Sequence, residues 1–89
     1  MANRRTLKRD IKYICDELIA ECIALMLYKP DVPLTDIDNL MEQILTIRND
    51  FVSRVSHTEP GNTRQFYQKL RADFNAQTDD IIEALSNLS

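Results

Sequence analysis

The chain has 89 residues and a formal net charge of −3, from 11 basic and 14 acidic side chains, which gives no indication of a nucleic-acid or membrane partner. This length allows one domain, residues 1–89, with a thin hydrophobic core. Hydrophobic residues make up 44% of the chain, which argues against intrinsic disorder, and one glycine and three prolines are too few for most all-β folds.

The first expected helix spans residues 7–28. Apolar residues recur in it at spacings of three and four, the pattern of a helix with one buried face. They are Ile11, Cys15, Leu18, Cys22 and Leu25. Thr6 is the expected N-cap. We expect the helix to end near Tyr28, because Pro30 disfavours a helical conformation at the residue before it.

The second expected helix spans residues 36–56. Thr35 is its expected N-cap, and the acidic residues Asp36 and Asp38 suit the positive end of the helix dipole. The same spacing of three and four continues along this segment through Ile37, Leu40, Ile44, Ile47, Phe51 and Val55.

The third expected helix spans residues 63–88. It follows the turn signal Pro60-Gly61, and Asn62 or Thr63 is its expected N-cap. Its expected buried stripe is Phe66, Leu70, Phe74, Gln77, Ile81, Leu85 and Leu88. Gln77 is the weak point of this stripe, and the modest helix propensity around it is compatible with a bend. Because the loops are short, the expected fold is all-α, an antiparallel up-down-up three-helix bundle.

The sequence indicates a cytoplasmic protein without a membrane partner. Its most apolar stretch, residues 18–28, is too short to cross a bilayer, and no apolar segment follows the basic N-terminus as in a signal peptide. Cys15 and Cys22 fit a reducing compartment. Seven residues separate them on one helix, about 10.5 Å along its axis, which is too far for a disulfide. We expect both thiols to pack in the core.

Several classes of enzyme are excluded by what the chain lacks. A single glycine cannot form a Gly-rich phosphate loop, and one histidine, His57, is too few for a zinc cluster with the separated cysteines. A catalytic triad would need His57, which lies in or beside a loop. A histidine in such a position beside serines is far more often solvated than catalytic. We therefore expect no enzyme, no metal site and no cofactor.

The net charge hides a separation between the two ends of the expected bundle. Residues 1–15 and 47–72 share one end, the basic pole, where ten basic residues face three acidic ones for a net charge of +7. The other end carries a net charge of −10. Arg5, Lys8, Arg9 and Lys12 share one helical face at i, i+3, i+4 and i+7. Positive charge is unfavourable at a helix N-terminus, which hints at an external anion.

Two functions fit these patterns. The first is a protein-interaction module that self-associates through helix one as a twofold dimer, because this helix has apolar residues beyond what a three-helix core can hide. The expected interface residues are Leu25, Leu27 and Tyr28. The alternative for these residues is that they only cover the end of the bundle.

The second function is binding of a polyanion, either nucleic acid or phosphate, at the basic pole. The expected anion-binding residues are Arg4, Arg5, Lys8, Arg9, Arg54, His57 and Arg64. The alternative is that salt screens these charges and nothing binds. The charge pattern favours protein interaction over nucleic acid, because the chain is acidic overall and lacks a helix-turn-helix signal.

Two segments, Asn3 to Ile11 and Arg54 to Gly61, resemble those of a small uncharacterised all-helical protein family of Bacteroidetes-type bacteria. The resemblance would cover nearly the whole chain. It implies a bacterial cytoplasmic protein and no activity, so it assigns no functional residues.

Overall fold

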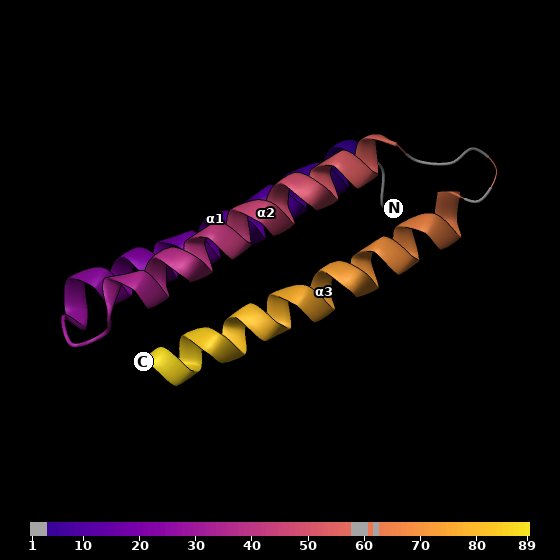
Figure 1. Cartoon of the computed structure of the whole chain (residues 1–89). Coiled ribbons are helices and arrows are strands. Elements are labelled where there is room, and N and C mark those ends of the chain that lie inside the picture. Colours follow the sequence, from indigo (N-terminus) through magenta and orange to yellow (C-terminus); the bar gives the residue numbers. More distant parts are fainter. Residues whose placement is uncertain (1–3, 58–60, 62) are drawn as a thin grey trace.

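Three helices account for nearly the whole chain in a computed structural model, which describes residues 4–57, 61 and 63–89. They are α1 (Arg4–Tyr28), α2 (Leu34–Ser56) and α3 (Thr63–Leu88). The helices run up, down and up in an elongated bundle that measures 51 × 20 × 18 Å (Figure 1). The expected all-α three-helix bundle is therefore confirmed.

Two helices begin earlier than their sequence signals indicated. Because α1 begins at Arg4, Thr6 lies within its first turn and is not the N-cap. Because α2 begins at Leu34, Pro33 occupies the N-cap position in place of Thr35. The Pro33 carbonyl already accepts hydrogen bonds from the amides of Asp36 and Ile37, at 3.1 and 3.4 Å, so the helix starts without a side-chain cap.

The third helix matches its expected bounds. It is one continuous helix through the segment of modest propensity around Gln77. The alternative N-cap Asn62 lies outside the described residues.

Each helix buries one stripe of side chains in a common core. The buried hydrophobic residues of α1 and α2 are Leu7, Ile11, Cys15, Leu18, Cys22, Leu25, Ile37, Leu40, Ile44, Ile47, Phe51 and Val55. Phe51 is fully buried and meets Phe74 of α3 edge-to-face, with ring centroids 5.3 Å apart. The guanidinium of Arg54 lies over the Phe51 ring at 4.6 Å and covers it from the solvent side.

The buried stripe of α3 differs from the expected one at three positions. Tyr67 is buried and Phe66 only half-buried, while Thr78 is buried and Gln77 exposed. Leu88, the expected last member, is only half-buried at the end of the helix. Thr78 can be buried at low cost because its hydroxyl donates a hydrogen bond to the carbonyl of Asn75, at 3.1 Å. The longer Gln77 amide stays in solvent, where it can hydrogen-bond to water.

The three helices do not pack equally on one another. Both α1 and α3 pack along α2, whereas α1 and α3 approach each other at few places. Two ion pairs, each 3.8 Å long, connect the N-terminal half of α3 to the other helices. Arg54 of α2 pairs with Asp73, and Asp10 of α1 pairs with Arg71. Two separate cavities lie between α1 and α3, one of about 30 Å³ beside Arg71 and one of about 340 Å³ beside Ile82. The larger cavity lies away from the basic pole.

Phe51→Ala should lower the free energy of unfolding by about 3–5 kcal/mol, because it removes a buried ring. Ile44→Val removes one methylene and should cost about 0.5–1.5 kcal/mol, which keeps the test possible if Phe51→Ala does not fold. Urea denaturation followed by circular dichroism measures both. An equal loss from Leu27→Ala, whose side chain is exposed, would contradict this description of the core.

Candidate interaction surfaces

The two cysteines belong to the core and not to a reactive site. Both thiols are fully buried and free. Burial raises the pKa of each thiol above its usual value. For Cys15 the cation of Arg48 opposes this rise and the anion of Asp16 adds to it. A raised pKa leaves less thiolate at neutral pH, so both groups are poor nucleophiles in the folded protein.

Alkylation should reveal this burial directly. At pH 8, iodoacetamide should modify Cys15 and Cys22 about a hundredfold more slowly in the native protein than in guanidinium, because reaction requires opening of the bundle. Mass spectrometry measures the rates. The stability from thiol burial is fully present below the usual thiol pKa and is lost as the pH rises through the raised values. Rapid alkylation of the native protein would place at least one thiol on the surface.

In the part of the chain that the structure describes, no helix is long and apolar enough to cross a membrane. In the same residues, no group of three or more His, Cys, Asp or Glu side chains is arranged to hold a metal ion.

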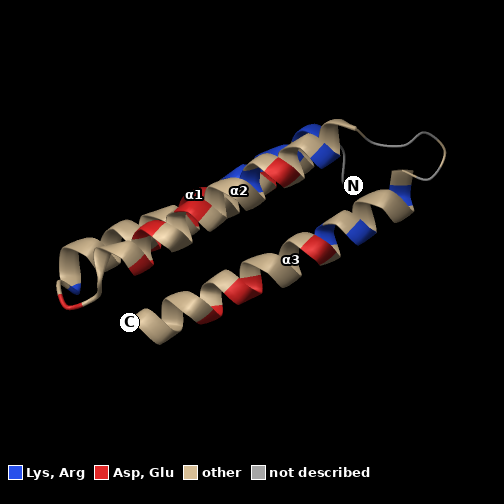
Figure 2. Cartoon of the chain, in the orientation of Figure 1, with Lys and Arg blue, Asp and Glu red and all other residues tan. Residues whose placement is uncertain are grey.

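Basic residues gather at the end of the bundle where α1 begins, α2 ends and α3 begins, and acidic residues predominate toward the opposite end (Figure 2). Arg4, Arg5 and Arg9 are exposed and Lys8 is half-buried. None of these four forms an ion pair with the described residues. Arg64 is exposed in the first turn of α3. We call Arg5, Lys8, Arg9 and Lys12 the cationic face of α1. None of its members, Lys12 included, pairs with a carboxylate of the described residues.

Two of the expected anion-binding residues are already engaged within the chain. Arg54 pairs with Asp50 at 3.0 Å and with Asp73 at 3.8 Å, so its charge is neutralised by carboxylates on α2 and α3. The His57 side chain follows the last turn of α2, where Nδ1 donates a hydrogen bond to the Ser53 carbonyl at 2.8 Å. Their local partners make both residues weaker anion ligands than the cationic face.

The ion pair between Asp16 of α1 and Arg48 of α2, at 4.0 Å, marks one side of the bundle. On α1, Ile23 and Leu27 follow Asp16 at helical spacing. On α2, Leu45 precedes Arg48 by three residues. These side chains therefore share the side that the ion pair marks. We call this surface the apolar face and define it by its exposed members, Ile23, Met26, Leu27, Leu34 and Leu45, with Ile19 and Met41 half-buried beneath them.

The expected interface residues divide between three places. Leu27 is 70% exposed and belongs to the apolar face. Leu25 is only 8% exposed, so the expectation that it lies outside the three-helix core is wrong. It follows Cys22 by three residues and continues the buried stripe of α1. Tyr28 is 78% exposed, but it follows Glu21 by seven residues and so lies on the side of α1 that faces α3.

A groove runs between α1 and α3 on another side of the bundle. Leu18 and Leu25 of α1 and Ile82 and Leu85 of α3 form its floor, and Glu17 and Glu21 stand at its edge. Ile82 is 49% exposed. We call this surface the α1–α3 groove. It combines apolar side chains from two helices with carboxylates on its rim.

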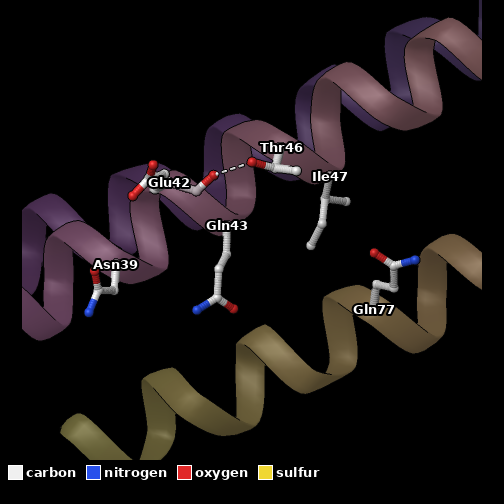
Figure 3. Close-up of a pocket in the computed structure, with 6 residues that line it drawn as sticks. All are labelled: Asn39, Glu42, Gln43, Thr46, Ile47 and Gln77. Carbon is white, nitrogen blue, oxygen red and sulfur yellow. Dashed lines mark hydrogen bonds between the residues drawn. The ribbon is translucent and has the colours of Figure 1, made fainter.

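A second groove, of about 520 Å³, lies between α2 and α3 (Figure 3). Its lining residues are Asn39, Glu42, Gln43, Thr46, Ile47 and Gln77, of which all but Ile47 are exposed. The Thr46 hydroxyl donates to the Glu42 carbonyl at 2.9 Å. Gln43 and Gln77 project into the groove from opposite helices (Figure 3), and most of the lining is amide, hydroxyl or carboxylate, so this groove offers little apolar contact.

Comparison of the chain with known protein families, curated proteins and solved structures found no match. The resemblance of two segments to a helical bacterial family stays a prediction. The sequence-based prediction missed most of the apolar face. The sequence pattern that could have revealed this face is a second line of apolar residues beside the buried stripe of α1. Ile23, three residues before Met26, is the clearest member of that line.

Proposed function

We propose that the chain is a protein-interaction module that self-associates through the apolar face. The observation that carries this proposal is the exposure of five large aliphatic side chains on one side of the bundle, between 42% and 70% each. Full burial of an exposed side chain of this size gains about 1.5–3 kcal/mol, and these side chains are about half-exposed, so each gains about half of that when covered. Covering the face therefore compensates for a small core. Two free thiols fit a cytoplasmic location for this module.

The position of the cationic face favours an antiparallel, twofold pair. The cationic face and the apolar face occupy the same side of α1, because Lys12 and Ile19 are seven residues apart and Arg5 precedes Lys12 by seven. In a parallel pair, the two cationic faces would lie side by side and repel. In an antiparallel pair they lie at opposite ends, and the apolar halves contact each other.

Light scattering coupled to size-exclusion chromatography tests this pairing. The wild-type mass should approach twice the chain mass of 10.3 kDa as concentration rises. Ile23→Glu or Leu45→Glu should give a monomer, because each places a carboxylate in the apolar contact. Ile82→Glu is the matched control, because Ile82 is equally exposed but lies in the α1–α3 groove. This variant should dimerise like the wild type.

A wild-type mass of 10.3 kDa at every concentration up to about 1 mM (a free energy of about −4 kcal/mol) would exclude self-association. A dimer that survives both Ile23→Glu and Leu45→Glu would show that another surface mediates it.

Anion binding by the cationic face is the second candidate function. The observation that favours it is a difference in ion pairing between basic residues. Carboxylates pair with Arg48, Arg54 and Arg71, whereas the cationic face has no ion pair with the described residues. Four like charges on one helical face attract a polyanion without reading its sequence.

Binding of mixed-sequence RNA at about 50 mM salt tests this second function, because electrostatic affinity is greatest there. Lys8→Gln/Arg9→Gln should weaken binding at least tenfold. Lys29→Glu changes the net charge by the same amount outside the basic pole, and should change binding less than threefold. Absence of binding by the wild type, or equal losses from the two variants, would exclude a dedicated anion site.

A further inference from the structure

We propose that the α1–α3 groove is a second docking site, which receives a cationic amphipathic helix from a partner protein. This site is distinct from the apolar face and does not depend on self-association. Its partner is defined by chemistry: one apolar side that covers the floor of the groove, and lysines or arginines that meet the carboxylates on its rim.

The arrangement of the three helices leaves room for a fourth. In a four-helix bundle each helix packs on two neighbours and is diagonal to the third. Here α2 packs on both α1 and α3, whereas α1 and α3 make little contact with each other. Their relation resembles that of two diagonal helices with the last corner open. A fourth helix at that corner would pack on α1 and α3 and would close the bundle.

The floor of the groove is suited to an apolar helix side. Leu18, Leu25 and Leu85 are almost fully buried but line the groove, and Ile82, the fourth residue of the floor, has half of its surface in solvent. Ile14, four residues before Leu18, is also partly exposed. The line from Ile14 to Tyr28 on α1 spans about 21 Å, which matches a partner helix of about four turns.

The rim of the groove selects the charge of the partner. Glu17 and Glu21 lie one turn apart on α1 and line the groove. Asp79 precedes Ile82 by three residues, so it lies on the same side of α3. None of these three carboxylates forms an ion pair with the described residues. Lysines or arginines that flank the apolar side of a partner helix would pair with them, and an acidic helix would be repelled.

The probe is a synthetic 18-residue helix with leucines at i, i+3, i+4 and i+7 and lysines elsewhere, compared with a twin in which each lysine is glutamate. Titration calorimetry at about 50 mM salt should show the cationic peptide binding at least tenfold more tightly than its twin, and more weakly at higher salt. Amide chemical-shift changes should centre on Leu18, Leu25 and Ile82.

Matched variants separate docking in the groove from general attraction to an acidic protein. Glu17→Lys/Glu21→Lys should weaken binding of the cationic peptide at least tenfold and should favour the acidic twin. Asp38→Lys/Asp80→Lys changes the net charge by the same amount, but at exposed residues outside the groove. This control variant should change binding of the cationic peptide less than threefold. Ile82→Ala should weaken both peptides by reducing the apolar contact.

Equal losses from the two charge-reversing pairs would overturn the proposal, because the attraction would then be unspecific. Shift changes confined to other surfaces, or no binding at all, would also overturn it. Leu45→Glu, which disables the proposed dimer, should still bind the cationic peptide. The docking site and the self-association proposal can thus fail independently.

Discussion

Every surface described above depends on the double role of α2. An 89-residue chain folded as three helices can build one small core, and each helix has one buried stripe to contribute. The stripe of α2 serves both neighbours at once. Phe51 is fully buried between them, pairs edge-to-face with Phe74, and is covered by Arg54. Because α2 takes the central position, α1 and α3 each keep lateral surface that the chain does not cover.

The charges follow from the same topology. The turns bring the basic start of α1 beside the end of α2 and the start of α3, which concentrates positive charge at one end. The interhelical ion pairs that involve Asp10, Asp16 and Asp73 use part of that charge to hold the helices in register. Each pair is partly exposed, so each adds little stability. What they leave is a cationic face on α1 and an acidic rim on the α1–α3 groove, which differ in the partners they attract.

Much of the fold could be predicted because every expected member of the apolar stripes of α1 and α2 is buried. The stripe of α3 could not be settled at one point, since Gln77 and Thr78 both fit helical spacing after Phe74. The short hydroxyl side chain that bonds to its own backbone is the one that is buried. Pairing of Arg54 with Asp50 was visible as an i, i+4 spacing, but pairing with Asp73 required the helices to be placed. The groove between α1 and α3 depends on the separation of two helices, which no local pattern encodes.

Distances between spin labels in the intact protein test the central claim most directly, because they report association, face and orientation together. The buried native thiols do not compete for the label, so one cysteine introduced as Ala20→Cys or Lys8→Cys is modified selectively. Ala20 is exposed and follows Asp16 by four residues, so it lies on the side of α1 that carries the apolar face. An antiparallel pair through that face predicts a short distance between the two labels at Ala20→Cys. For Lys8→Cys it predicts about 40 Å or more, at 1.5 Å per helical residue. Short distances from both positions, or no dipolar coupling from either, would contradict the account.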